Sequence, residues 1–262
     1  MGTQTKPDYG LDAPGVVRRL LFFGLLLILA GVGLLIAGGR TRFLLWPGWS
    51  FVCGGIAQAA TGAAMLWGSR VGKLGLRDQL LASLPWRGDE RVLDVGCGHG
   101  LFLIGAAKRL TGGSAVGLDL WQAEDQAGNS REATMRNATL EGVGDRINLR
   151  DGDARQMPFA NESFDLVLSS WALHNIYEPA GRRSALKEIV RVLKPGGRVA
   201  IVDIRHCQEY AVALANLGLV DVHLSGPHFI FVIPSRSVSA VKPLRGGMNA
   251  ERAEAGSLKQ GH

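Results

Sequence analysis

Cysteine is scarce in this sequence, which has three cysteines in 262 residues, Cys53, Cys97 and Cys207. They are odd in number, and neither C-x-x-C spacing nor a neighbouring pair of histidines accompanies them. The pattern therefore indicates neither a disulfide framework nor a structural zinc site, and we expect no metal site. A reducing compartment fits this cysteine usage.

Charge is absent from two long stretches near the N-terminus. Residues 20–38 and 49–67 contain no charged side chain, and Arg40 and Arg42 lie between them. Each run is 19 residues long, close to the length of helix that crosses a bilayer. A signal peptide would have a shorter apolar region followed by a small-residue cleavage site and a polar segment. We therefore predict a transmembrane helical hairpin over residues 20–67.

Small residues four apart accompany both runs and predict close helix packing. They are Gly33 with Ala37 in the first run, and Gly55, Ala59 and Ala63 in the second.

Basic residues predict the orientation of this hairpin. Arg18 and Arg19 precede it, Arg70, Lys73 and Arg77 follow it, and the turn carries two arginines. Because the flanks outnumber the turn, the positive-inside rule places both ends of the hairpin in the cytoplasm. We expect residues 1–19 to be a cytoplasmic N-terminal segment and residues 68–89 to be an amphipathic connector. The leucines of the connector could rest on the membrane or cover neighbours of the first strand.

The net charge of +6 is compatible with two kinds of partner. A basic surface suits nucleic acid, and it suits an anionic membrane surface equally well. The sign of the charge alone does not choose between them.

The segment VLDVGCGHG, Val92–Gly100, is the most informative motif of the chain. An apolar run ends there in three glycines at alternate positions, and the next residues have helical spacing. Glycine permits a sharp turn and a close approach of the backbone to a ligand. The pattern predicts a strand, a ligand-binding loop and a helix whose N-terminus faces the ligand.

This motif and its successors resemble those of class I S-adenosylmethionine-dependent methyltransferases. The matching segments are VLDVGCGHG, then AVGLDLW at 115–121, RDGDARQMPF at 150–159, SFDLVLSSWALHNI at 163–176 and LKPGGRVAIVDI at 193–204. The resemblance covers roughly residues 90–234 and implies S-adenosylmethionine as cofactor. It implies that Asp94 and the glycine loop hold the methionine part, that Asp119 binds the ribose hydroxyls and that Asp153 meets the adenine amino group. We predict cofactor binding by Asp94, Gly96, Cys97, Gly98, His99, Gly100, Asp119, Leu120, Asp153, Ala154 and Ser169.

The alternation of strands and helices predicts an α/β fold. We expect a doubly wound, mostly parallel, seven-stranded sheet of the Rossmann-like methyltransferase type over residues 90–234. Helices are expected at about 123–142, 180–193 and 211–217, and two β segments at 221–234. Residues 235–262 are rich in glycine, serine and charge without periodicity, and we expect a disordered tail there.

Catalytic residues are less evident, because methyl transfer depends mainly on alignment of the reacting atoms. Candidates for a base lie after the fourth and fifth strands, His174, Tyr177, Asp203 and His206. We select His174 and Asp203 as catalytic residues. A histidine that only shapes the substrate site is the alternative for His174.

Two motifs of nucleic-acid and protein methylation are missing from the chain. It has neither the N/D-P-P-Y/F motif of amino-group methylation in nucleic acids and glutamine nor the Pro-Cys nucleophile of cytosine methylation. These absences argue against nucleic acid, and the middle of the domain resembles small-molecule and quinone-type methyltransferases. Because only about twenty residues separate Trp67 from the first strand, the domain is also tethered near the membrane. We predict a membrane-anchored methyltransferase, with its catalytic domain in the cytoplasm, acting on a small apolar or amphipathic, quinone-like or lipid-like acceptor. The alternatives are a membrane-anchored S-adenosylmethionine sensor without catalysis and a membrane-tethered RNA methyltransferase.

Overall fold

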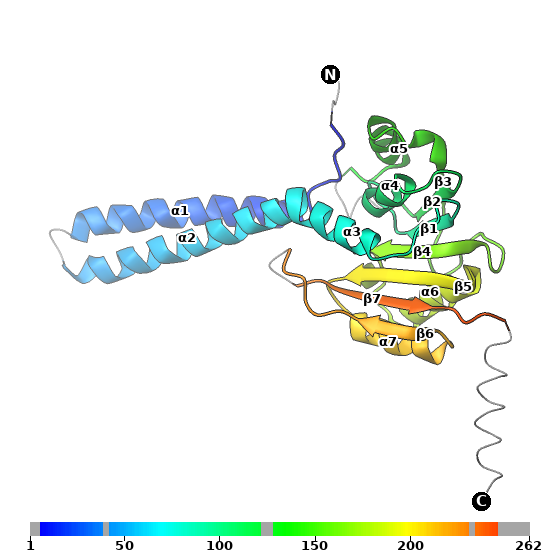
Figure 1. Ribbon diagram of the computed structural model, residues 1–262. Coiled ribbons are helices and arrows are strands. Elements are labelled where there is room, and N and C mark those ends of the chain that lie inside the picture. Colours follow the sequence, from blue (N-terminus) through cyan, green and yellow to red (C-terminus); the bar gives the residue numbers. More distant parts are fainter. Residues whose placement is uncertain (1–5, 39–41, 122–127, 231–233, 246–262) are drawn as a thin grey trace, which may run out of the picture.

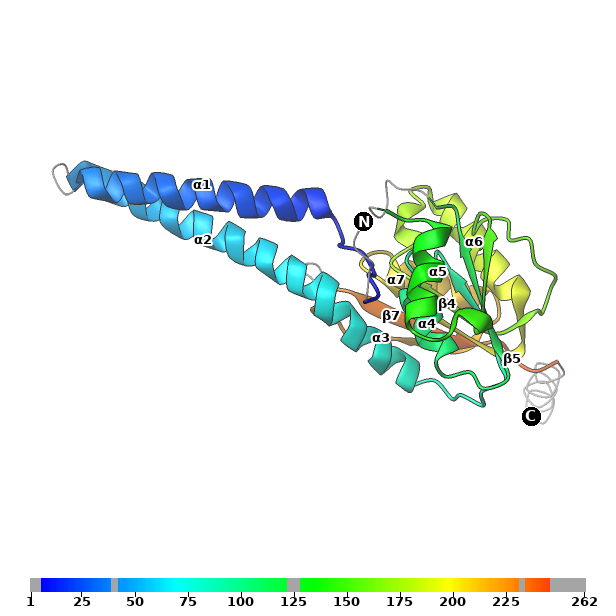
Figure 2. The same cartoon turned by 90° about the horizontal axis from the view of Figure 1, so that it is seen from above.

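The computed structural model describes residues 6–38, 42–121, 128–230 and 234–245. A long helical hairpin projects from an α/β domain (Figures 1 and 2). It extends from the side of the sheet toward which β4 (Phe164–Ser170) and β5 (Leu193–Asp203) point.

Helices α1 (Pro14–Gly38) and α2 (Leu45–Trp67) form the hairpin. They coincide with the two predicted apolar helices, although α1 begins six residues before Leu20. By length and composition alone, α1 and the continuous helical stretch Arg42–Ala82, which contains α2, could each cross a membrane. The turn between them, at residues 39–41, lies outside the described residues.

Glycines seven residues apart bring the two helices together. A Cβ atom on Gly24 would lie 2.9 Å from the carbonyl oxygen of Gly55, and one on Gly31 would lie 2.7 Å from that of Gly48. The buried glycines of the hairpin are Gly24, Gly31 and Gly38 on α1 and Gly48, Gly55 and Gly62 on α2.

The predicted packing residues are only partly those in contact. Gly55 and Ala59 face α1, but a Cβ atom on Gly33 would meet nothing within 4 Å, and Ala37 and Ala63 are exposed. The prediction for these three was wrong because the interface follows a seven-residue repeat rather than a four-residue one.

Helix α2 does not stop at the end of the hairpin. It continues through a π-helical turn, Gly68–Gly72, into α3 (Lys73–Ala82). Leu76 and Leu81 of α3 are buried against the domain core, so the connector covers the neighbours of β1 rather than lying free.

The domain contains a seven-stranded sheet with the strand order β3-β2-β1-β4-β5-β7-β6. The strands are β1 (Arg91–Val95), β2 (Ser114–Asp119), β3 (Ile147–Asp151), β4 (Phe164–Ser170), β5 (Leu193–Asp203), β6 (Val220–Leu224) and β7 (Arg236–Val241). The first five are parallel, whereas β7 runs antiparallel to both β5 and β6. This confirms the predicted mostly parallel, doubly wound sheet.

Side chains of a strand alternate between the two faces of the sheet, so apolar residues of the strands lie on both faces. Helices cover both of these apolar faces. Val92 of β1 packs in the core with α4 (Leu101–Ala107) and α5 (Arg131–Leu140). Leu93 and Val95 pack in the core with α6 (Pro179–Val192) and α7 (Cys207–Asn216).

The predicted C-terminal boundary of the domain was wrong. We expected two β segments within 221–234 and a disordered tail from Ser235, but the second strand of this pair is β7 at Arg236–Val241. Val238 and Ala240 are almost fully buried, so the alternation of Ser and Val in this segment is that of a strand between two partners. Residues 246–262 lie outside the described residues.

Helix α5 is also shorter than predicted. It begins at Arg131 rather than near Ala123, with Ser130 capping it through a side-chain hydrogen bond from the amide of Ala133. Residues 122–127 lie outside the described residues.

Candidate functional site

A cavity of about 380 Å³ lies at the carboxyl ends of the parallel strands. Its volume falls in the range of small-molecule sites, and this edge of an open α/β sheet is where such folds bind ligands. The arrowheads of β4 and β5 point toward the base of the hairpin, so the cavity lies on the hairpin side of the domain (Figure 1).

The glycine loop forms one wall of the cavity. Gly96, Gly98 and Gly100 have φ angles of +71°, +48° and +86°, a region that other residues rarely adopt. A Cβ atom on Gly96 would also lie 2.2 Å from the Cβ atom of Ala172. Glycine is therefore required at Gly96 for both its conformation and its close packing against the chain after β4.

Asp119 connects the end of β2 to this loop and lines the cavity. Its carboxylate accepts hydrogen bonds from the amides of Gly98 at 2.8 Å and Trp121 at 2.7 Å, and from Nδ2 of Asn129 at 3.2 Å. A carboxylate has about four acceptor positions, so about one remains for a ligand. Asp119 thus organises the loop and can accept a hydroxyl hydrogen at the same time.

Asp94 lies in β1, two residues before Gly96, and its side chain is fully buried and makes no hydrogen bond of good geometry among the described residues. Burial raises the pKa of Asp94 to about 7, an effect that the backbone amide of Leu103 only partly opposes. Asp94 is not among the residues lining the cavity. Its predicted contact with the methionine part of a cofactor stays a prediction.

Asp153 lines the cavity together with Arg155. Nε and Nη2 of Arg155 donate to the Asp153 carboxylate at distances of 2.6 to 3.0 Å. Hydrogen bonds from this guanidinium keep the pKa of Asp153 below its usual range. The carboxylate is ionised and positioned, although its predicted contact with adenine is untested.

His174 and Asp203, the two predicted catalytic residues, contact each other beside the cavity rather than in it. Nδ1 of His174 lies 2.6 Å from Oδ1 of Asp203, and Oδ2 of Asp203 accepts hydrogen bonds from the His174 amide and the Tyr210 hydroxyl. Asp203 is almost fully buried. Neither residue lines the cavity, whereas Leu173 and Asn175 do.

The two other candidate bases differ in position. Tyr177 lines the cavity and is largely exposed, and His206 lies 3.4 Å from Glu209 on α7. A catalytic role of His174 and Asp203 therefore stays a prediction.

Most of the predicted cofactor residues surround one space. The cavity is lined by Gly96, Cys97, Gly98, His99, Asp119, Leu120, Asp153 and Ala154, but not by Asp94, Gly100 or Ser169. Ser169 instead donates to the carbonyl oxygen of Val95 at 2.9 Å and holds β4 to β1.

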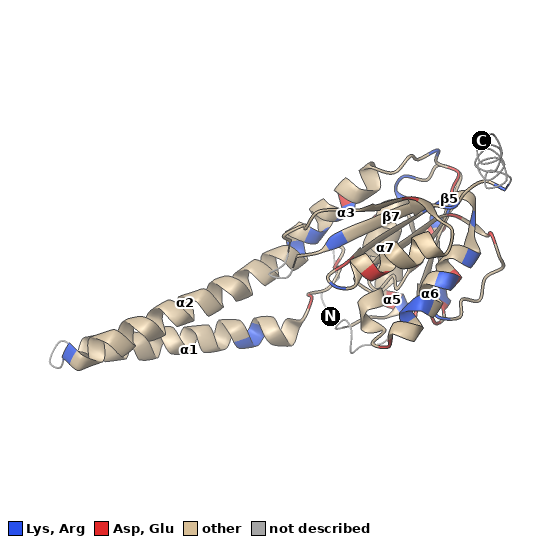
Figure 3. Ribbon diagram, turned by 90° about the horizontal axis from the view of Figure 1, so that it is seen from below, with Lys and Arg blue, Asp and Glu red and all other residues tan. Residues whose placement is uncertain are grey.

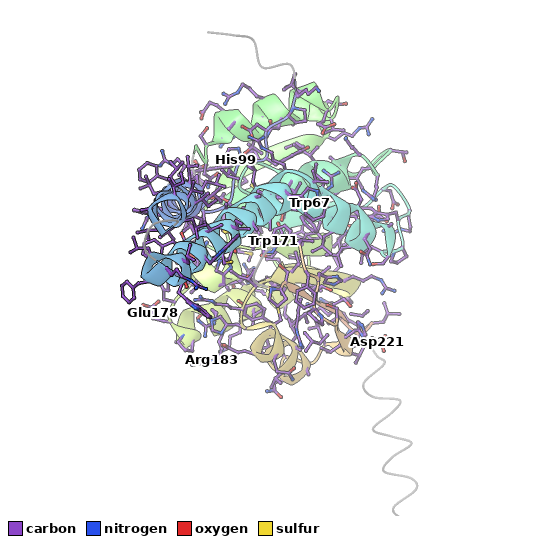
Figure 4. The ribbon with its side chains drawn as sticks, turned by 90° about the vertical axis from the view of Figure 1, so that its left-hand side faces the viewer. Trp67, His99, Trp171, Glu178, Arg183 and Asp221 are labelled. Atoms are coloured by element: carbon purple, nitrogen blue, oxygen red, sulfur yellow. The ribbon has the colours of Figure 1, made fainter. Side chains whose placement is uncertain are left out.

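Several residues of the cavity wall were not predicted from the sequence, among them Tyr9, Asp12, Lys73 and Trp171. Trp171 follows β4 with a φ angle of +48°, and its indole Nε1 donates to Oγ of Ser235. Figure 4 shows Trp171 and His99 from the hairpin side, near the base of α2. No sequence pattern predicts the positive φ angle of Trp171.

The residues present fit the cofactor that the sequence implies. S-adenosylmethionine carries cationic groups, ribose hydroxyls and a flat adenine ring. Asp12, Asp119 and Asp153 line the cavity with acceptors, the glycine loop lets the backbone approach closely, and Leu101 and Leu118 add apolar wall. Nothing in this wall opposes a cationic ligand except Lys73 and Arg155, and both are paired with carboxylates.

Comparison with known proteins agrees with this geometry. Residues 93–201 match the family described as "Methyltransferase domain". The chain is 35% identical over 128 residues to demethylmenaquinone methyltransferase of Lactiplantibacillus plantarum, covering 48% of this chain and 50% of that protein. It is 33% identical over 128 residues to 27-O-demethylrifamycin SV methyltransferase of Amycolatopsis mediterranei, covering 49% of this chain and 43% of that protein.

A solved structure shows the same fold. An S-adenosylmethionine-dependent methyltransferase from Aquifex aeolicus superposes with a TM-score of 0.51 at 19% identity, over 63% of this chain and 88% of that one. The chain spans about half the length of the curated relatives it matches. Residues 93–201 thus match a methyltransferase domain, and S-adenosylmethionine is the cofactor that the family and its structural neighbours support.

Proposed function

We propose that this chain is a membrane-anchored S-adenosylmethionine-dependent methyltransferase that methylates a small apolar or amphipathic acceptor reached from the bilayer surface. The observation that carries this proposal is the position of the cavity at the base of the apolar hairpin. Asp12, two residues before α1, and Lys73, six residues after α2, both line it.

The surface of the hairpin supports a location in the bilayer. Phe22, Leu29 and Ile36 of α1 have exposed fractions of 59%, 59% and 76%, which is unusual for isolated water-soluble helices. Lys and Arg occur near the two ends of the hairpin and not along its middle (Figure 3). A helix of 25 residues is about 37 Å long at 1.5 Å per residue, enough to cross the hydrocarbon core.

The connector is a less basic membrane contact than its sequence suggests. Lys73 and Arg77 are buried, at 2% and 7% exposure, and each is paired with an aspartate. Of Arg70, Lys73 and Arg77, the basic residues that follow α2 directly, Arg70 is the exposed one. Attraction to anionic lipid therefore contributes about 1 kcal/mol from Arg70 rather than from three charges.

The relatives favour a small apolar acceptor. The names of the two curated relatives describe one enzyme that methylates a quinone precursor and another that methylates a rifamycin. A quinone-like acceptor dissolves in the bilayer, and a cavity at the membrane surface would receive it at high effective concentration.

The chemistry requires little from the protein beyond alignment. S-adenosylmethionine supplies an electrophilic methyl group, and positioning contributes up to roughly 7 to 11 kcal/mol of barrier reduction in such reactions. The loop, Asp119 and Asp153 would orient the cofactor. His174, held by Asp203, lies beside the cavity between the lining residues Leu173 and Asn175, and in this proposal it would accept a proton from a hydroxyl or acidic carbon nucleophile.

The test is to supply methyl-labelled S-adenosylmethionine to membranes that contain the protein, and to fractionate the products. Label in a lipid-soluble small molecule, absent with a Gly96→Ala variant, is the expected result. Label in RNA contradicts the proposed acceptor, and cofactor binding without any labelled product favours a sensor.

Access from the membrane needs a separate test. Removing residues 1–67 is unsuitable, because it also removes Tyr9 and Asp12 from the cavity wall. The full chain in nanodiscs can instead be given two acceptors with the same reactive head, one carrying a long apolar tail and one without it. We expect the tailed acceptor to have the higher kcat/KM, and equal values would contradict membrane access.

A further inference from the structure

Residues 6–12 precede the hairpin and cross the face of the domain next to the cavity. We call them the N-terminal strap. The strap descends along the domain from the N-terminal side to the start of α1 (Figure 1), which begins at Pro14. Its sequence, KPDYGLD, has no periodicity, and nothing in the known motifs of the domain assigns a role to it.

One end of the strap is fixed to the glycine loop through Asn137 of α5. Oδ1 of Asn137 accepts from the Asp8 amide at 2.9 Å, and its Nδ2 donates to the carbonyl oxygens of Asp8 at 2.8 Å and His99 at 3.0 Å. Nδ1 of His99 lies 3.1 Å from the same Asp8 carbonyl. Asn137 is almost completely buried, so these bonds are made away from water, where an unmade bond is costly.

The other end is fixed by Lys73. Lys73 is only 2% exposed, and its ammonium group donates to the carbonyl oxygens of Tyr9 and Gly10, at 2.9 and 2.7 Å, and to Oδ2 of Asp12 at 3.1 Å. Three donors therefore meet three acceptors of the strap. Burial of an ammonium group is expensive unless every proton is bonded, so Lys73 specifies this path of the chain.

The fixed strap presents groups to the cavity. Tyr9, Asp12 and Lys73 line the same space as Gly98, His99 and Asp119. The Asp12 side chain retains 38% exposure while Lys73 holds one of its oxygens. A carboxylate at this wall complements a cationic ligand.

We propose that the N-terminal strap is part of the cofactor site, with Asp12 as a binding residue and Lys73 as the positioning residue that holds the strap in place. This inference rests on the proposed function. The strap joins α1, and Lys73 follows α2 directly, so the two ends of the hairpin meet at the cofactor wall. Cofactor affinity consequently depends on the hairpin being folded.

The experiment uses the full chain in nanodiscs and S-adenosylhomocysteine, the demethylated form of the cofactor, as the probe. Calorimetry measures its affinity for the wild type, Asp12→Asn and Lys73→Met, with the exposed, remote substitutions Asp145→Asn and Lys187→Met as matched controls. Hydrogen exchange of the wild type follows the amides of residues 8–12 with and without the probe. The melting temperature of each variant without ligand is measured alongside.

We expect Asp12→Asn, which preserves shape, to weaken binding about tenfold with little change in the melting temperature, and Lys73→Met to weaken it further. Exchange in residues 8–12 should slow at least tenfold when the probe binds. Wild-type affinity retained in both variants, with unchanged exchange in the strap, overturns this proposal alone. Failure of the wild type to bind the probe overturns the proposed function, and this inference with it.

Discussion

A Cβ atom placed on Gly96 would lie 2.2 Å from the Cβ atom of Ala172, so the loop after β1 and the chain after β4 are in contact without space for one methyl group. Gly96 also has a φ angle of +71°. Gly96→Ala should therefore move the loop away from Ala172, lower the melting temperature and reduce cofactor affinity more than tenfold.

Calorimetry and thermal unfolding of the same preparation measure both effects. Gly112→Ala is the matched control, because a Cβ atom there meets nothing within 4 Å and its φ angle is not positive. Unchanged cofactor affinity in Gly96→Ala would remove this loop from the site.

Asp119→Asn tests the carboxylate that joins β2 to the loop. An amide nitrogen would face the Gly98 amide, which now donates to Oδ2 at 2.8 Å, and a charge-assisted bond to a ribose hydroxyl would be lost. Hydrogen bonds to charged groups contribute roughly 1.5 to 3 kcal/mol, so affinity should fall by roughly ten- to a hundredfold. Calorimetry on this variant and on the exposed Asp145→Asn separates the effect of the site from that of charge.

Asp94 predicts a dependence of stability on pH. Burial raises its pKa from 3.8 to about 7, so the folded state keeps a proton that the unfolded state releases between these values. The free energy of unfolding should fall as pH rises from about 4 to about 7, because the folded state binds more protons in this window.

Denaturant titrations at several pH values measure this slope. Asp94→Asn, a neutral residue of the same shape, should reduce the slope, and a variant that keeps the wild-type slope would show that another group titrates.

The hairpin offers adjacent glycines with opposite surroundings. A Cβ atom on Gly55 would lie 2.5 Å from the carbonyl oxygen of Gly24, whereas one on Gly54 would meet nothing within 4 Å. Gly55→Val should separate α1 from α2 and destabilise the hairpin by about 1 to 3 kcal/mol, and Gly54→Val should not. Unfolding in detergent, followed by the fluorescence of Trp46, Trp49 and Trp67 on α2, compares the two, and equal midpoints would argue against this interface.

The sheet and the glycine loop were predictable because their signals are local. Each of these signals occupies only a few residues: the apolar run of β1, the three glycines, and the acidic residue that ends β2. The order of such strand and helix units along the chain predicts a doubly wound sheet. The hairpin was visible for the same reason, since absence of charge over 19 residues is a local property.

The errors have physical causes that no local pattern contains. The strap is held by contacts such as Asp8 with Asn137, 129 positions apart, and its own composition resembles that of a linker. Strand β7 is stabilised by pairing with β5 and β6 on both sides. The sequence alone does not show this pairing, and the segment is rich in serine and charge, so it was predicted as a disordered tail. His174 was expected in the cavity, but the buried Asp203 carboxylate attracts its ring to the side.

The π-helical turn at Gly68–Gly72 joins α2 to α3 without a break, so one rod of 38 residues, Leu45–Ala82, runs from the tip of the hairpin into the domain core. With the hairpin in a bilayer, the fixed length of this continuous helix would set the distance of the cavity from the lipid. A thicker membrane would draw the hairpin inward or reduce its tilt, and the cavity would move relative to the headgroups. On the proposed function, bilayer thickness would then select the depth at which an embedded acceptor meets the cavity.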